Sequence, residues 1–268
     1  MLAQIDWSRP WLDAVRPAYE RLGAGVGSDS DVPVSTALSR AAAGLALVNA
    51  NGQPLRFVAQ ADLPEGRAYE EFIGATGCVP TRENLHDFFN GLVWLTFPLI
   101  KRELNALQAA QIALAGVGKS RGPARDAATI FDENAALLIV QDDAEGAALV
   151  AALRAHDWTK ALYQQRDQFD ARAQVWLFGH ALMEKLVAPR KAITAHTRVV
   201  LAPAGFFTQA HDAQRAWIDS IVAASLASAG LDKASLTPLP VLGVPRWWDG
   251  QDAAFYQDTS VFRPKRVI

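Results

Sequence analysis

The sequence contains a single cysteine, Cys78, among its 268 residues. One cysteine excludes an intrachain disulfide framework and is typical of proteins of the reducing cytoplasm. Long hydrophobic runs are missing too, because the longest, Gly91 to Ile100, is far short of the ~20 residues that a membrane helix needs. The N-terminal residues MLAQIDWSRPW form neither a basic nor an apolar signal segment. We therefore expect a soluble cytoplasmic protein without membrane contact.

The sequence also lacks a large excess of charge of either sign. Its formal net charge is −2, so no overall field favours binding to nucleic acid or to an anionic membrane. Hydrophobic residues make up 50% and charged residues 20% of the chain, which is an ordinary globular composition and argues against disorder. Internal repeats and obvious linkers are absent. We expect one domain over residues 1–268, with a small-molecule ligand as its partner; the oligomeric state stays open.

The hydrophobic patterns predict an α+β fold, mostly helical, with a small sheet. Two β-rich runs flank Asn51-Gly52 and predict a hairpin near 45–60. Apolar runs predict strands near 136–140 and 197–203. The C-terminal segment, residues 236–268, is rich in proline and aromatic residues. We expect it to be extended and packed on the body, since so many aromatic side chains would not stay in solvent.

The longest helical signal covers residues 80–111 and contains Pro98. Proline lacks the amide proton and clashes with the preceding helical turn, so we expect two helices, about 82–96 and 98–115, with Thr81 as the N-cap of the first. The second is amphipathic, and Lys101 lies on its polar side. A helix predicted over 171–187 is apolar nearly all round and should be central.

The first candidate site residues are His86, Asp87 and Asn90, in the apolar helix 82–96. Residues i and i+4 share a helix face, so His86 and Asn90 should point the same way. A histidine at the edge of an apolar stripe can act as a general base or a metal ligand. The alternative is a structural histidine bonded to a carbonyl, with Asp87 stabilising the helix N-terminus.

A second pair, His180 and Glu184, stands at i and i+4 in the predicted central helix. A buried carboxylate must be paired, shifted in pKa or bound to a cation. We consider both residues catalytic candidates and, with His86, candidate metal ligands. The His-x-x-x-Glu pattern is weak because it lacks the second histidine of H-E-x-x-H. A His–Glu or Glu–Lys pair that joins two helices is the alternative.

Charged residues gather between 121 and 133, where few apolar neighbours surround them. Arg121 and Arg125 are candidates for binding a carboxylate or phosphate, because a guanidinium can hold either one bidentately. Asp126 is a candidate to complete a metal shell with the histidines. Internal salt bridges and turn caps would explain the same cluster without any ligand.

Two further candidates follow Pro189 and lead into the strand 197–203. We include Lys191 among the substrate-binding candidates, with Arg121, Arg125 and Asn90, and His196 among the metal ligands. Functional groups often lie at the ends of strands and helices. The alternative for each is a residue of a solvated loop.

Several strings resemble a bacterial family catalogued as proteins of unknown function, number 3025. They include PTRENLHDFFNGLVWLTFP, RGPARDAATIFDEN, FGHALMEKLVAPRKAITAHT and FYQDTSVFRPKR. The resemblance covers roughly residue 8 to the end of the chain. It supplies no catalytic residues, because no activity is established for that family.

Two hypotheses follow for the function. In the first, His86, Asp87, His180 and Glu184 form the catalytic site of a small-molecule enzyme. Its reaction would be a hydrolysis, either general acid–base or assisted by a divalent metal. In the second, the protein is non-catalytic, either structural or partner-binding, and its buried polar residues form a network that only stabilises the fold.

Overall fold

The structure, a computed structural model, describes residues 1–23, 26, 32–115 and 122–265 and has the predicted α+β fold. A four-stranded sheet consists of β3 (Ala135–Gln141), β4 (Ala173–Leu177), β5 (Thr194–Ala202) and β6 (Thr237–Pro240). The strands lie in the order β4-β3-β5-β6. β3 and β5 are parallel, and each pairs antiparallel with its edge neighbour.

The sheet separates two hydrophobic clusters. Successive side chains of a strand point to opposite faces, and β3 therefore contributes to both clusters. Leu137 and Ile139 belong to the larger cluster, whereas Leu138 and Val140 belong to the smaller one. Because both faces are covered, β3 is apolar along nearly its whole length and was predictable as a buried strand.

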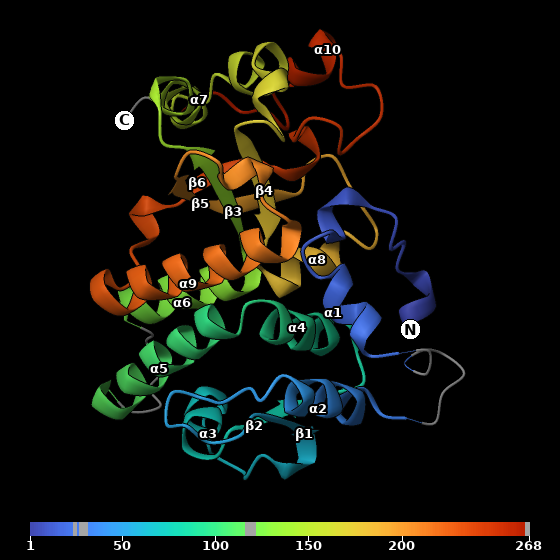
Figure 1. The fold of residues 1–268 in the computed structure, drawn as a ribbon, viewed down its shortest axis with the longest axis vertical. Coiled ribbons are helices and arrows are strands. Elements are labelled where there is room, and N and C mark those ends of the chain that lie inside the picture. The colour runs from blue at the N-terminus through green and yellow to red at the C-terminus, as the bar shows by residue number, and fades with distance from the viewer. Residues whose placement is uncertain (24–25, 27–31, 116–121, 266–268) are drawn as a thin grey trace.

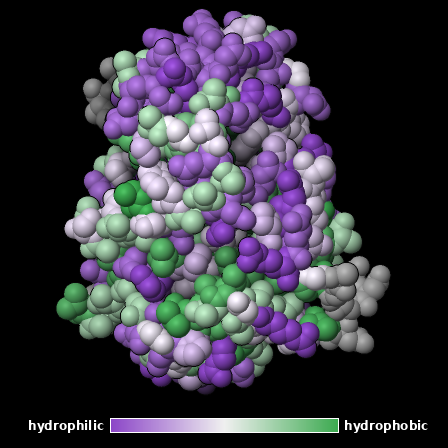
Figure 2. Space-filling view, in the orientation of Figure 1, coloured by the Kyte–Doolittle hydropathy of each residue, from purple (hydrophilic) through white to green (hydrophobic). Residues whose placement is uncertain are grey.

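The smaller cluster occupies the upper end of the molecule in Figure 1, where α7 (Ala144–Arg154) and α10 (Ala253–Tyr256) lie. Tyr256 and Phe262 are each only 3% exposed, so the C-terminal segment packs on the body. The outer surface of this end is mostly hydrophilic (Figure 2).

The larger cluster extends from the four-stranded sheet through the helices below it to the bottom of the molecule in Figure 1. Those helices are α1 (Arg16–Arg21), α4 (Leu85–Thr96), α5 (Pro98–Ala115), α6 (Pro123–Asn134) and α9 (His211–Ala229). Pro98 separates α4 from α5, as predicted. Within the described ranges, no helix is both long and apolar enough to cross a bilayer.

The N-cap of α4 differs from the prediction. Asn84 caps the helix, because its side chain accepts a hydrogen bond from the amide of Asp87 at 2.8 Å. Thr81 instead ends the strand β2 (Cys78–Thr81), where its hydroxyl donates to the carbonyl of Val79.

The lowest layer in Figure 1 contains α2 (Val34–Gly44), α3 (Tyr69–Thr76), β1 (Arg56–Ala59) and β2. The turn at Asn51-Gly52 forms, with one antiparallel bridge between Val48 and Pro54. The chain after this turn does not continue as a long hairpin, however, because β1 pairs in parallel with β2.

The helix predicted over 171–187 was wrong. The structure divides this stretch into β4 and a short helix, α8 (His180–Lys185), joined at Phe178-Gly179. A buried strand followed at once by a buried helix is apolar all round, just as one central helix would be, and periodicity alone does not separate the two. His180 consequently begins a helix instead of standing within one.

Candidate functional site

The site is organised around two histidines from different parts of the chain. His86 lies in the first turn of α4, and His180 is the first residue of α8. Their Nε2 atoms are 3.1 Å apart, and the ring planes are 81° apart with centres at 4.5 Å. The two histidines are 94 positions apart in the sequence, and they form a pair because α4 packs against α8.

Glu184 holds the outer side of this pair. Its Oε2 atom lies 3.0 Å from Nδ1 of His86, and the side chains of His86 and Glu184 are 33% and 40% exposed. An ionised carboxylate only accepts hydrogen bonds, so Nδ1 of His86 carries a proton. When His86 is neutral, its Nε2 is therefore an acceptor, and Nε2 of His180 is the donor between the two rings.

His180 is the buried member of the pair. Its Nδ1 atom lies 3.8 Å from Oδ2 of Asp132 and has no hydrogen-bond partner among the described residues. Burial lowers the pKa of His180 to about 4, with Asp132 acting in the opposite direction and Lys101 and His86 adding to the decrease. At neutral pH His180 is thus uncharged, and its ring can both donate and accept a proton.

Behind His180, Lys101 and Asp132 form an ion pair inside the protein. Nζ of Lys101 is 2.6 Å from Oδ1 of Asp132 and 2.8 Å from Oδ1 of Asn90. The ammonium also lies 5.3 Å from the centre of the Trp94 ring. Burial alone would raise the pKa of Asp132, but the positive charge of Lys101 and the neighbouring His180 outweigh it, and the pKa is lowered.

More polar groups surround this ion pair. Nδ2 of Asn90 donates to the Tyr69 hydroxyl at 3.1 Å, and Nδ2 of Asn105 donates to Oε2 of Glu70 at 2.6 Å. Burial raises the pKa of Tyr69 well above its usual value, and burial followed by the charge of Asp132 raises that of Glu70. The buried polar region therefore extends from the histidine pair to α3.

Several polar atoms in this region have no hydrogen-bond partner among the described residues. They are Nε1 of Trp94, Oδ1 of Asn105, Nε of Arg125 and Nδ1 of His180. A buried unpaired donor or acceptor costs about 1–3 kcal/mol, and such atoms are few in native proteins. Among the described residues, this buried polar region is thus less completely hydrogen-bonded than is usual for a protein interior.

Asp87, a predicted catalytic residue, is occupied by Arg82. Its Oδ2 accepts from the Arg82 amide at 2.6 Å and from Nε at 2.9 Å, and its Oδ1 accepts from the guanidinium at 2.9 Å. The Arg82 side chain is 57% exposed, and the charge of Glu184 contributes to raising its pKa. Asp87 thus fixes a cation beside the exposed end of the histidine pair.

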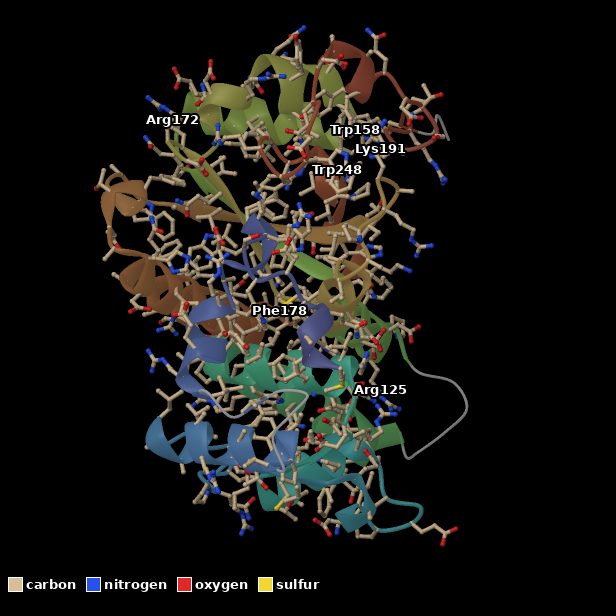
Figure 3. All side chains as sticks on the ribbon, turned by 90° about the vertical axis from the view of Figure 1, so that its right-hand side faces the viewer. Arg125, Trp158, Arg172, Phe178, Lys191 and Trp248 are labelled. Atoms are coloured by element: carbon tan, nitrogen blue, oxygen red, sulfur yellow. The ribbon has the colours of Figure 1, made fainter. Side chains whose placement is uncertain are left out.

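The predicted substrate-binding residues lie in different places. Asn90 binds Lys101 and Tyr69. Half-buried Arg125 lies close enough to Glu70 to oppose, in small part, the rise in the pKa of Glu70. Arg121 is outside the described residues. Lys191 donates to Asp258 at 2.7 Å instead. Figure 3 places it in the upper part of the molecule and Arg125 in the lower half.

The two remaining metal candidates do not join the histidine pair. Asp126 is exposed in the first turn of α6. His196 lies on β5 opposite Ala135 and Pro238, and its partial burial lowers its pKa. In the described part of the chain, no group of three or more His, Cys, Asp or Glu residues is arranged to hold a metal ion.

The polar residues of α5 could have indicated the buried part of the site, but the prediction took the polar side of this helix to face solvent. Lys101, Asn105 and Gln108 follow one another at i, i+4 and i+7 on α5, and each is 8% exposed or less. The prediction assigned Lys101 to the polar, solvent-facing side of this helix, and that was wrong. A polar stripe of helical period predicts solvent exposure by default, and only the packing of α3 and α6 against α5 reverses this.

Comparison with known proteins identifies the family. A family model described as "Protein of unknown function (DUF3025)" matches residues 55–266. The chain belongs to this family. The match confirms the resemblance in the sequence, and its range includes His86, Lys101, Asp132, His180 and Glu184. No curated protein and no solved structure matches the chain, so the site of this DUF3025 member is interpreted from its own geometry.

Proposed function

We propose that this DUF3025 member is an enzyme that hydrolyses a small anionic molecule by general acid–base catalysis. The observation that supports this most is the continuous contact from Glu184 through His86 to His180, exposed at one end and buried at the other. General acid–base catalysis needs a proton acceptor that a substrate can reach and that is held in position. Glu184 and His86 meet both conditions.

Each residue of the site has a distinct role in this proposal. The exposed carboxylate of Glu184 takes a proton from the attacking water. The Nδ1–H of His86 donates a hydrogen bond to this carboxylate and holds it in position. His180 is a positioning residue that holds the His86 ring at Nε2. The Arg82 guanidinium, fixed by Asp87 beside Glu184, binds the anionic group of the substrate.

The leaving group receives the same proton back from Glu184, so the enzyme ends in its starting protonation state. The unpaired polar atoms around Lys101 support a site that is complete only with further hydrogen-bond partners. The version of this proposal with a divalent metal has less support. The histidine pair supplies only two ligands, whereas catalytic zinc sites typically have three protein ligands.

The non-catalytic alternative has its own supporting observation. Lys101, Asp132, Asn90 and Tyr69 bind one another inside the protein, and such a network can serve stability alone. The two hypotheses differ at Glu184, whose exposed carboxylate contributes little to stability but is essential for the proposed reaction.

The test measures hydrolysis by the wild type and by Glu184→Gln over a panel of chromogenic phosphate, carboxylate and sulfate esters. Loss of the proton acceptor should lower kcat/KM by about 10²–10⁴-fold, with an unchanged unfolding temperature. Glu145→Gln, which alters a glutamate on α7 whose side chain is 59% exposed and paired with Arg172, is the control and should keep the wild-type rate. No hydrolysis of any panel member, or an unaffected Glu184→Gln variant, would overturn the proposal.

The cellular location is a further part of this proposal. We infer a cytoplasmic enzyme, and the buried, unpaired Cys78 supports this because a reducing compartment keeps such a thiol free. The small net charge supports a small molecule, and not a nucleic acid, as the ligand.

A further inference from the structure

A cavity of about 150 Å³ lies along the outer edge of β4. Residues from three other parts of the chain close it: the first helical turns near Trp11, the start of α9 at His211, and the segment that carries Trp247. None of His86, His180 and Glu184 lines it. Drug-sized ligands occupy about 300–1,000 Å³, so this cavity has the size for a single small ring.

Aromatic rings form much of the cavity wall. His211 stacks on Trp176, with ring centres 4.3 Å apart and planes at 19°. Trp11 and Trp247 also line the cavity, with ring centres 6.4 Å apart. The indole N–H of Trp176 is already bonded to Gln174 at 3.1 Å, which fixes the orientation of this ring. Rigid aromatic walls favour a ligand with flat apolar faces.

The rim of the cavity is charged but balanced. Asp13 pairs with Arg16 at 2.5 Å, and Asp170 pairs with Arg246. Each carboxylate thus has an arginine of its own, and a ligand would meet no net charge from these four residues. A cationic ligand would have to compete with both arginines, whereas hydroxyl groups can bind to carboxylates that are already paired, because each carboxylate has several acceptor positions.

The backbone at the rim is strained on both sides of the same ion pair. Asp170 has a φ of 72° and Arg246 a φ of 70°. Non-glycine residues rarely adopt positive φ, and for a long side chain such as arginine the conformation is unfavourable. Strained residues of this kind concentrate at ligand-binding and functional sites, where the surrounding structure holds them in place.

From these observations we propose that the cavity is a binding site for one neutral, hydroxyl-bearing ring, of the class of a pyranose sugar. The apolar face of the ring packs against Trp247 and the His211–Trp176 stack. Its hydroxyl groups bind the carboxylates of Asp13 and Asp170 at the rim. The site is independent of the acid–base site and of the reaction proposed there.

Calorimetric titration of the full-length protein with a panel of neutral monosaccharides tests the proposal. Choline, as a cation, and adenosine, as a flat base, are the comparison ligands. The proposal predicts saturable binding of at least one monosaccharide and at least tenfold weaker binding to His211→Ala. Binding of only choline or only adenosine would overturn it, as would no binding of any monosaccharide.

A matched control separates the cavity from general effects of losing a histidine that packs against a tryptophan. His156 packs against Trp158 outside the cavity, with ring centres 4.9 Å apart and planes at 35°, and His156→Ala should bind the sugar as the wild type does. Asp170→Asn keeps the shape of the rim but removes a charged acceptor, and it should weaken binding severalfold. Equal weakening by His156→Ala and His211→Ala would overturn the assignment of the site to this cavity.

Discussion

Lys101 and Asp132 meet 2.6 Å apart with side chains only 5% and 11% exposed. The pair connects α5 to α6 directly behind His180. Removing one partner of a buried ion pair leaves an uncompensated charge, which costs more than the pair itself contributes.

Replacing Lys101 by Met should therefore lower the free energy of unfolding by about 3–5 kcal/mol. The double variant Lys101→Met with Asp132→Leu should recover much of this loss, because no charge is then left unpaired. Urea unfolding measures both. Arg102→Met, at the next and partly exposed position, is the control and should cost less than about 1 kcal/mol. Equal effects at 101 and 102 would contradict the buried-charge explanation.

The low pKa of His180 makes stability depend on pH. The pKa of His180 is about 4 in the folded protein and 6.5 in the unfolded chain, so below pH 6.5 the unfolded chain takes up a proton that the folded protein does not. Keeping His180 neutral in the folded protein therefore costs no stability above pH 6.5. As the pH falls from 6.5 to 4, the free energy of unfolding decreases by roughly 3 kcal/mol from this residue. His180→Asn should flatten the unfolding free energy over this window. A slope as steep as that of the wild type would contradict the assignment.

Asp219 should make the free energy of unfolding depend on pH in the opposite direction. It is 4% exposed on α9 and accepts hydrogen bonds from the amides of Leu99 and Ile100 at 3.0 and 2.9 Å. Burial raises its pKa to about 6 from 3.8, although these two amides act against the increase. As the pH falls from 6 to 3.8 the folded protein takes up a proton first, so this group increases stability by roughly 3 kcal/mol. In Asp219→Asn that increase should be absent, so the free energy of unfolding should fall more steeply than in the wild type as the pH decreases from 6 to 3.8. A shallower decrease would refute the prediction.

Gly179 sets the position of His180. A Cβ atom there would lie 2.5 Å from the amide nitrogen of Ala135 and 2.6 Å from the carbonyl oxygen of Glu133. Both are backbone atoms of the α6–β3 connection and cannot rotate away. Gly179→Ala should therefore cost about 1–3 kcal/mol or more and separate the histidine rings. Gly122→Ala, where a Cβ would meet nothing within 4 Å, is the control. Histidine NMR signals would show whether the pair is disturbed, and unchanged signals would contradict the prediction.

Much of the fold could be predicted from local patterns. Pro98 divided the long helical signal correctly, because loss of an amide proton acts on the helix wherever it packs. The strand β3 was recognisable because burial on both faces makes it continuously apolar. The stretch 171–187 could not be resolved in this way, since a buried strand and a buried helix are equally apolar.

The candidate site was predictable only as separate residues. His86, His180 and Glu184 were recognisable as polar groups in apolar surroundings, because such groups need partners. Nothing local indicated that His86 binds Glu184 across 98 positions of the chain, or that Lys101 binds Asp132 across 31. Arg82, fixed by Asp87, gave no sequence signal beyond its charge.

The sequence by itself determined where the helices break, which strand is buried, and which polar side chains must find partners. These properties depend on backbone chemistry and on hydrophobicity within a few residues of each position. Only the tertiary structure decided which partners those side chains have. The packing of α4 on α8 and of α5 on α6 brings the two histidines together, with His86 partly exposed and His180 buried, and takes Lys101 and Asp132 inside. Contacts between distant segments depend on how whole faces pack, and the local sequence does not contain that information.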